Sequence, residues 1–328
     1  MATIEDVAKR SGVSVATVSR VINGTGVVSA KLSKRVHDAI EELNYRPNFS
    51  GRNLRLNETR TLLVICSVAL DVILDGIYAA ADELGYRVIV HYIGGCRQHR
   101  PYIDEWFYGN VDGALLYAAF YPDEELGRIS RTLPLVQCCS YLELPNVARV
   151  SIDEEGAAFD MTDRLLSRGF RVGMASMVAP DAQETFVHKR ERGYRRALEA
   201  RGVAFDPDLV LRCPSTYENN YALGRRLAAL RDRIDCVFCV HDRQAMAVVC
   251  ALQDMGLQVP QDMAVAGFDD MEMAKLCRPR LTTIAQPFSQ IGNAALRLLV
   301  SQIRGEDVAG REVFLRHELI ERDSTRRG

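Results

Sequence analysis

The chain has 328 residues, of which 48% are hydrophobic and 26% charged, which is enough for more than one domain with a sizeable core. A formal net charge of -2 alone would argue against a nucleic-acid partner, but the charge is unevenly placed. Residues 1–60 hold 10 Lys and Arg against 6 Asp and Glu, which leaves 31 and 37 for the rest. A basic N-terminal region on an acidic body suits a protein that contacts phosphates with one end.

The composition does not favour a secreted or membrane protein. The nine cysteines lie mostly in apolar runs without the spacing of a disulfide framework, which predicts buried free thiols in a reducing compartment. The start lacks the basic and apolar regions of a signal peptide, and no window reaches about 18 uncharged apolar residues. We therefore expect a soluble cytoplasmic protein without membrane contact.

Residues 3–23 predict two short helices joined by a tight turn. Thr3 followed by Asp6 is typical of a capping box, Gly12 permits the turn, and Ser14 can cap the second helix. Helical spacing turns three apolar side chains of the second helix inward, namely Val18, Val21 and Ile22. The side chains left outward are Val15, Ala16, Thr17, Ser19 and Arg20.

A third helix is predicted over residues 30–44, where Leu32, Val36, Ile40 and Leu43 form one apolar stripe. The outward face of the second helix is small at its start, so that it can approach DNA bases closely. Val15 and Ala16 suit thymine methyl groups, and Arg20 suits guanine. The remaining polar side chains suit phosphates, which fix the position on DNA without reading its sequence. These candidates are Ser14, Thr17, Ser19, Lys31, Lys34 and Arg35.

The run A-T-I-E-D-V-A-K-R-S-G-V-S-V-A-T-V-S-R-V-I-N resembles the N-terminus of the LacI/GalR family of bacterial transcription regulators. The resemblance continues through residues 45–48 and into residues 52–55, which match the family's hinge helix. It implies that this hinge folds on specific DNA, pairs with its dimer mate in the minor groove, and inserts Leu54 into a base step. The residues that it adds to the DNA-binding set are Asn48, Arg52, Leu54 and Arg55. An ordinary flexible linker is the alternative for residues 48–57.

After residue 60, apolar runs of strand length alternate with amphipathic helical stretches, which predicts parallel sheets covered by helices. We expect two doubly wound subdomains. The expected strands are 62–68, 87–93, 111–118, 133–139, 172–178, 209–213, 236–242 and 263–268. The expected helices are 74–84, 123–131, 187–201, 217–231, 244–255 and 289–304.

The family resemblance covers this body more loosely, through residues 111–113, 190–194, 268–270, 279–284 and 319–324. It implies a core similar to periplasmic sugar-binding proteins, in which two lobes close on a small effector. The domains are then a head over 1–46, a hinge over 47–57 and a core over 58–328. Within that core, the first lobe takes about 58–154 and 287–313, and the second takes about 155–286 and 314–328.

The resemblance also assigns effector-binding residues. Arg190 and Asp269 match the family's effector-gripping pair, and His241 stands where the family usually has asparagine. Tyr217 could supply an aromatic surface that the first lobe lacks. Two alternatives stay open, because Arg190 could be a charge on a helix surface and His241 a satisfied histidine at a strand end.

Metal, cofactor and catalytic motifs are missing from the sequence. Cys236 and Cys239 fall in one predicted strand, where a separation of three residues turns their side chains to opposite faces. The six histidines form no metal-ligand spacing, and neither a nucleotide-binding loop nor a nucleophile motif is present. We therefore expect no cofactor, no metal and no enzymatic activity.

These observations lead to one main hypothesis and two alternatives. The chain is predicted to be a sequence-specific transcription regulator, most often a repressor in this family. A homodimer would bind a near-palindromic double-stranded operator under the control of a small effector, a sugar or related metabolite. The alternatives are a sugar- or nucleoside-binding protein without a specific DNA role and an enzyme of flavodoxin-like type.

Overall fold

The computed structural model describes residues 2–23, 26–45, 58–68, 71–93, 109–118, 123–141, 144, 146–179 and 184–327. The chain divides into two compact units, residues 1–59 and 60–328, and each is described by itself. None of the helices in the described stretches has the length and apolar character that a membrane span requires.

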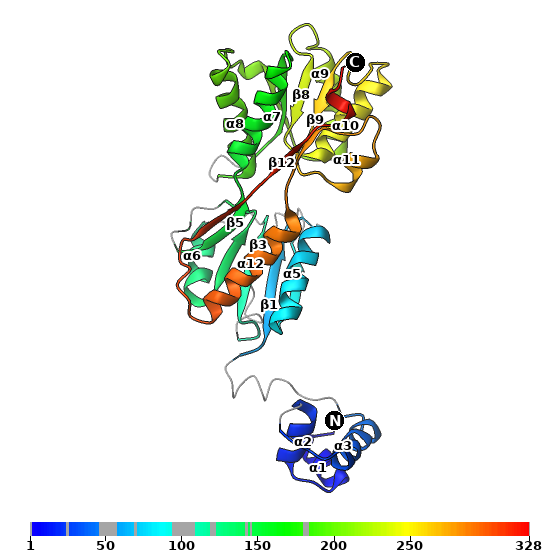
Figure 1. The fold of residues 1–328 in the computed structure, drawn as a ribbon, viewed down its shortest axis with the longest axis vertical. Helices are drawn as coiled ribbons and strands as arrows, with labels where there is room; N and C mark the ends of the chain where they lie inside the picture. The colour runs from blue at the N-terminus through cyan, green and yellow to red at the C-terminus, as the bar shows by residue number, and fades with distance from the viewer. Residues whose placement is uncertain are drawn as a thin grey trace. The chain divides into compact units, whose positions relative to one another are not determined.

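The first unit is a bundle of three helices, α1 (Ile4–Ser11), α2 (Val15–Asn23) and α3 (Ala30–Glu42) (Figure 1). Each helix contributes one fully buried valine to its core, and these are Val7, Val18 and Val36. Burial of this shared apolar face stabilises helices that are too short to persist alone.

The predicted caps of this bundle are confirmed. The backbone nitrogen of Thr3 donates to the Asp6 carboxylate over 2.8 Å, and the Asp6 nitrogen donates back to the Thr3 hydroxyl over 3.3 Å. Gly12 ends α1 with a φ of 62°, in the region that favours glycine. Ser14 caps α2 by accepting from the Thr17 nitrogen over 3.2 Å.

The second unit has two lobes, and the first is built on a six-stranded parallel sheet with the order β11-β5-β4-β3-β1-β2. Helices α5 (Asp71–Leu84) and α12 (Phe288–Ile303) pack together beside it (Figure 1). Their close approach needs Gly76, because a Cβ there would collide with the Ser289 carbonyl. The other elements are β1 (Thr61–Cys66), β2 (Arg87–Tyr92), β3 (Gly113–Tyr117), α6 (Asp123–Thr132), β4 (Leu135–Cys138), β5 (Ala148–Ile152) and β11 (Glu312–Leu315).

The second lobe is built on a four-stranded parallel sheet with the order β7-β6-β8-β9. Its strands are β6 (Val172–Met177), β7 (Val210–Cys213), β8 (Cys236–Cys239) and β9 (Ala264–Ala266). Its helices are α7 (Glu154–Ser167), α8 (Phe186–Ala200), α9 (Tyr217–Ala228), α10 (Asp242–Asp254) and α11 (Glu272–Leu276), with 3-10 turns at Pro207–Leu209 and Asp323–Thr325.

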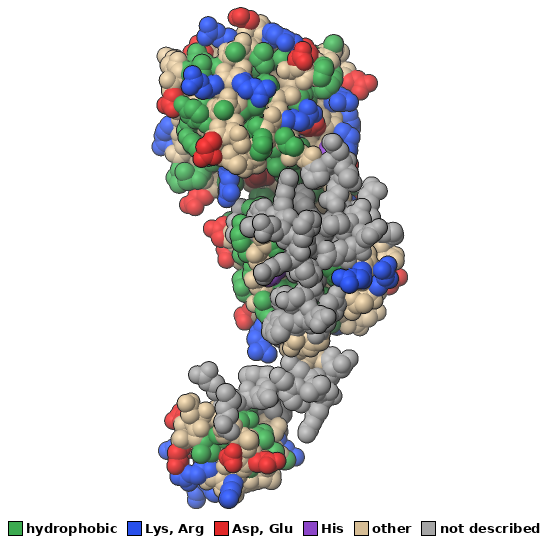
Figure 2. All heavy atoms as spheres, turned by 180° about the vertical axis from the view of Figure 1, so that it is seen from behind, with side chains coloured by type: hydrophobic (Ala, Val, Ile, Leu, Met, Phe, Trp, Pro, Cys, Tyr) green, Lys and Arg blue, Asp and Glu red, His purple; other side chains and the backbone are tan. Residues whose placement is uncertain are grey.

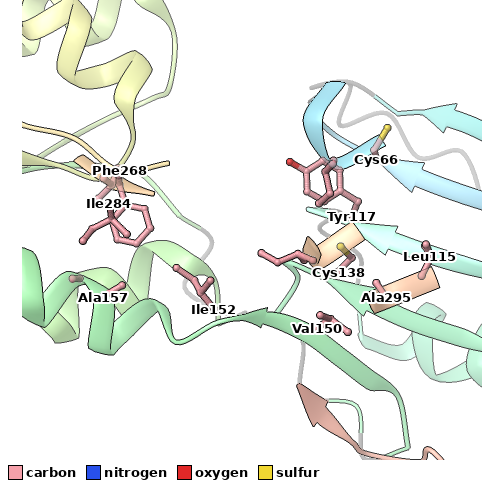
Figure 3. Packing of buried hydrophobic residues seen from close by; sticks show 14 of the residues in the cluster. Cys66, Leu115, Tyr117, Cys138, Val150, Ile152, Ala157, Phe268, Ile284 and Ala295 are labelled. Atoms are coloured by element: carbon pink, nitrogen blue, oxygen red, sulfur yellow. The ribbon is translucent and has the colours of Figure 1, made fainter. Parts of the chain in front are cut away.

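Three stretches of chain join the lobes: the step from β5 to α7, the step from β10 (Thr283–Ala285) to α12, and the step from β11 to β12 (Glu318–Ile320) (Figure 1). β10 and β12 pair antiparallel. One buried apolar cluster includes residues of both lobes. In Figure 3, Ile152 at the end of β5 lies between Phe268 of the second lobe and Val150 of the first.

The predicted succession of parallel strands and helices is confirmed, with several elements missed. The elements not predicted include β5 and α7, between which the chain first passes from the first lobe to the second, and the two C-terminal strands β11 and β12. The opposite orientation of Cys236 and Cys239 is confirmed, because the two thiols belong to clusters on opposite sides of the sheet. Cys250 on α10 is exposed, so the expectation of buried thiols is wrong for this residue.

Candidate functional site

The predicted DNA-reading face of α2 is exposed. Val15 is 41% exposed, and Ala16 and Arg20 are also exposed, whereas Val18 of the same helix is fully buried. An exposed valine beside an alanine is a small apolar surface of the kind that contacts thymine methyl groups in a major groove. The hydroxyl groups of Ser14 and Thr17 lie 2.9 Å apart at the start of this face, and Ser19 is partly buried.

The predicted phosphate contacts of α3 have different surroundings. Lys31 and Lys34 are exposed. The guanidinium of Arg35 donates to the Ser11 carbonyl over 2.6 Å, at the end of α1. This group therefore stabilises the corner between α1 and α2, in addition to the phosphate contact predicted for it.

The predicted hinge residues lie outside the described residues, and they are Asn48, Arg52, Leu54 and Arg55. On the core, basic and acidic side chains are interspersed over the face of the second lobe that Figure 2 shows.

The second candidate site surrounds Arg190 of α8, which is 3% exposed. Its Nε donates to the Glu154 carboxylate over 2.7 Å, and one terminal nitrogen donates to the Val240 carbonyl. The other terminal nitrogen lies 3.4 Å from Asp269, and the guanidinium carbon lies 3.5 Å from the ring centre of Phe268. The structure brings Arg190 and Asp269 together as predicted, and the alternative of a surface charge is wrong for Arg190.

Tight packing of α7 against α8 places this guanidinium. A Cβ at Gly193, one turn after Arg190, would collide with the Glu155 carbonyl. Glu154 is the first residue of α7, and Asp153 caps that helix by accepting from the Gly156 nitrogen over 2.9 Å. Glycine at position 193 therefore allows Arg190 to reach a carboxylate at the start of the neighbouring helix.

Further polar groups extend the site beyond the predicted residues. The Tyr141 hydroxyl donates to Glu154 over 2.6 Å, and the Gln286 amide nitrogen donates to Asp269 over 2.8 Å. The amide oxygen of Gln286 is buried and has no hydrogen-bond partner among the described residues. Sequence reasoning missed Glu154, Tyr141 and Gln286, although the Asp-Glu-Glu-Gly stretch after an apolar run is a usable helix-start signal.

Burial shifts the protonation of this site. Burial raises the pKa of Asp269 to about 6, against the opposing effect of Arg190, while Glu154 adds to the rise. For Arg190, burial acts to lower the pKa, but the charges of Glu154 and Asp269 outweigh it and the pKa is raised. Arg190 is therefore positively charged at neutral pH, and the two carboxylates are its partners.

His241 caps α10 at the end of β8. Its Nδ1 accepts from the Gln244 backbone nitrogen over 3.0 Å, and its Nε2 lies 3.1 Å from the Ser215 hydroxyl. Burial lowers the pKa of His241 to about 4, and Arg190 acts in the same direction. The ring is therefore neutral at pH 7, with the proton on Nε2, and both nitrogens have partners, as the alternative of a satisfied histidine expects.

Tyr217 opens α9, two residues after Ser215, and is 60% exposed. Its ring centre lies 6.0 Å from that of Tyr221. The structure thus places an aromatic ring at the surface near the His241 region and does not bring it against Arg190 in any described contact.

Two family models match this chain. "Bacterial regulatory proteins, lacI family" matches residues 3–48, and "Periplasmic binding protein-like domain" matches residues 162–325. The HTH-type transcriptional repressor CytR of Escherichia coli K12 is 36% identical over 338 residues, which cover 99% of this chain and 96% of that protein. The chain belongs to the lacI family of bacterial regulatory proteins. This lacI-family chain is a transcription regulator with a helix-turn-helix head and a periplasmic-binding-protein-like core, as the sequence predicted.

Other relatives match nearly the whole length of this lacI-family regulator. Catabolite control protein A of Priestia megaterium is 30% identical over 331 residues, which cover 99% of both chains. The solved structure of the transcriptional regulator CelR in a cellobiose complex is 30% identical, with a TM-score of 0.74, and covers 99% of this chain and 100% of that one. The lac repressor dimer bound to operator has a TM-score of 0.82 at 24% identity, with 99% of both chains covered, which shows the shared fold.

Proposed function

We propose that this regulator represses transcription by binding a near-palindromic double-stranded DNA site as a homodimer. The observation that carries this proposal is the exposed Val15–Ala16 surface on a capped, packed helix pair, with Arg20 one turn further along. A two-fold dimer would present two such surfaces to two half-sites. The apolar side chains of Val72 and Tyr78, which are 50% and 48% exposed on α5, are candidates for the dimer contact.

The proposed division of labour follows the sequence boundaries. Residues 1–46 read DNA and residues 47–57 form the hinge. Residues 58–328 bind effector and dimerise, with about 58–154 and 287–313 in the first lobe and about 155–286 and 314–328 in the second. Two of these boundaries need a small correction, because β11 extends the first lobe to Leu315 and α7 begins the second lobe at Glu154. In the hinge, Leu54 would enter a base step in the minor groove, while Asn48, Arg52 and Arg55 contact the surrounding DNA.

The proposed effector is a sugar or related metabolite held at the site around Arg190. Support comes from the buried guanidinium with two carboxylate partners, from His241 and Tyr217 nearby in the second lobe, and from the cellobiose complex of a 30% identical regulator. Effector changes DNA affinity only if it binds the two DNA-binding states of the protein unequally.

Family membership also supports the finer expectations about activity and place. We propose that the chain regulates without catalysing a reaction and that it works in the cytoplasm, where its DNA lies.

Fluorescence anisotropy with labelled genomic fragments at several salt concentrations tests the DNA-binding proposal. We expect sequence-selective binding that weakens with salt, because phosphate contacts release counterions. Val15→Glu should abolish selective binding by placing a negative charge against the DNA, whereas Val203→Glu, on a 44% exposed core position, should not. Wild-type protein that binds all fragments alike would leave the proposed role without support and favour a binding protein that lacks a specific DNA function.

A further inference from the structure

The ionised groups in direct contact with Arg190 are two carboxylates against its single positive charge. Glu154 and Asp269 both lie against a single guanidinium, and their side chains are 2% and 18% exposed, against 4% for Arg190. Three of the guanidinium's donors are already directed at Glu154, Val240 and Asp269. Two of the five guanidinium N–H donors remain, but an incoming carboxylate or phosphate that accepted from them would lie beside Glu154 or Asp269, and the like charges would repel each other.

The same site contains a buried hydrogen-bond acceptor without a partner among the described residues. The buried amide oxygen of Gln286 has no partner among the described residues, and its nitrogen donates to Asp269. A buried acceptor without a partner is costly and is satisfied by a ligand that donates to it. Nearby His241 is neutral at pH 7 because burial lowers its pKa to about 4, so it adds no positive charge that would attract an anion.

We propose that this site selects uncharged or cationic ligands that donate hydrogen bonds and excludes carboxylates and phosphates, with Glu154 as the residue that sets this selection. The inference rests on the proposed effector site and narrows its ligand class. Polyols, nucleosides and amino sugars satisfy it, whereas sugar acids, sugar phosphates and nucleotides do not. Glu154 would act through charge, while Tyr141 only orients the carboxylate through its hydroxyl.

The decisive probe is inorganic phosphate. Its binding is measured as stabilisation of the full chain against thermal unfolding at constant ionic strength. Wild-type protein should show no saturable stabilisation by phosphate that depends on Arg190. Glu154→Gln removes one negative charge at nearly constant shape and should create such binding, with an apparent Kd at least about tenfold below any wild-type value. Arg190→Met in the Glu154→Gln background should abolish the gain, and Tyr141→Phe, which keeps every charge, should not produce it.

A second measurement compares uncharged compounds with their charged partners on wild-type protein: uridine with uridine 5′-monophosphate, and glucose and glucosamine with gluconate and glucose 6-phosphate. Any member that stabilises the core should be uncharged or cationic. If Glu154→Gln does not fold, Asp269→Asn carries the same phosphate test, because Asp269 is the more exposed of the two carboxylates.

Three results would overturn the inference: Arg190-dependent binding of an anion by wild-type protein, an equal gain in Tyr141→Phe, or no gain in a folded variant that lacks one carboxylate. These readings involve no DNA. An anion that binds wild-type protein would therefore end the selection rule and leave the DNA-binding proposal intact, while loss of selective DNA binding would do the reverse.

Discussion

The outward face of α2 and the surroundings of Arg190 differ in exposure, in charge and in how far apart their residues lie in the chain. On α2 and its cap, the candidate residues lie within positions 14–20, most of them are exposed, and only Arg20 is charged. Around Arg190, the groups come from α7, α8, the end of β9 and the end of β10, and most of them are buried. The α2 surface presents small side chains and the guanidinium of Arg20 to a partner. The Arg190 site presents charged groups that are already paired with one another.

The two sites therefore differ in how much their side chains affect the stability of the folded protein. The side chains of the α2 face contribute little to the stability of the head, because they are exposed to solvent and make few contacts within it. The Arg190 site is coupled to the stability of the core, because removing one partner of a buried ion pair leaves the other charge buried without compensation. Mutations on α2 should therefore reduce DNA recognition and leave stability unchanged, whereas mutations around Arg190 should reduce the stability of the core.

Arg190→Ala gives the largest expected effect. Removing the guanidinium leaves Glu154 and Asp269 close together without their partner, which should destabilise the core by about 3–5 kcal/mol. Urea unfolding of the purified chain measures this change, and the effector response should be lost with it. Arg192→Ala is the control, because Arg192 pairs with Glu155 while 45% exposed, and its loss should cost about 1 kcal/mol or less. Equal losses in the two variants would show that the buried pair is not special.

Arg20→Ala should damage recognition and leave the fold intact. If Arg20 contacts a base, the variant should lose about 1–3 kcal/mol of preference at one base pair of each half-site. Lys34→Ala, which removes an exposed phosphate-type contact, should weaken binding to all sequences alike. Anisotropy titrations on a set of single-base operator variants distinguish these outcomes. A uniform loss for Arg20→Ala would place this side chain on the phosphate backbone.

Thr3→Ala should have a smaller effect, confined to the head. The substitution removes the hydroxyl that accepts from the Asp6 nitrogen and should cost about 1 kcal/mol of head stability. The full chain is heated while circular dichroism reports its helix content, and the unfolding transition of the head measures the loss. Thr3→Ser keeps the cap and serves as the control, and a Thr3→Ser variant as unstable as Thr3→Ala would assign the loss to something other than capping.

The effect that is smallest at neutral pH is a change in pH dependence, because it appears only on acidification. The pKa of His241 is lowered from 6.5 to about 4, so its contribution is complete above pH 6.5 and is lost as pH falls toward 4. The pKa of Asp269 is raised from 3.8 to about 6, so acidification through the same window stabilises the folded state. The two groups oppose each other in the wild-type protein.

His241→Asn keeps a good helix cap and removes the titrating ring. The variant should gain stability relative to wild type as pH falls from 6.5 to 4, as urea unfolding at several pH values would show. Asp269→Asn should shift the profile in the opposite sense. Parallel profiles for wild type and His241→Asn would contradict the lowered pKa of His241.

Sequence reasoning predicted the head more completely than the core. The Thr3–Asp6 capping box, the Gly12 turn and the Ser14 cap depend on residues within a few positions of one another, so local patterns contain them. The pairing of Arg190 with Asp269 joins residues 79 apart and was available only through family resemblance. Residue spacing by itself suggested a surface charge for Arg190, because its helix neighbours Lys189 and Arg192 are charged.

The missed residues have a common physical reason. Glu154 lies 36 residues from Arg190, and Gln286 lies 17 residues from Asp269, so only the packed fold brings them together. Missing β5 and α7 also hid Glu154, since a carboxylate at a helix start has no special meaning until the helix is known. The predicted hinge lies outside the described residues and stays a prediction.

The last stretch of the chain works as a strap between the lobes. β11 is an edge strand of the first sheet beside β5, and β12, only two residues further on, pairs with β10. Beyond it, Ser324 is fixed within the second lobe through hydrogen bonds with Val265 and Thr282. A deletion that removes β11, β12 and Ser324 would therefore disturb both lobes of the core at once.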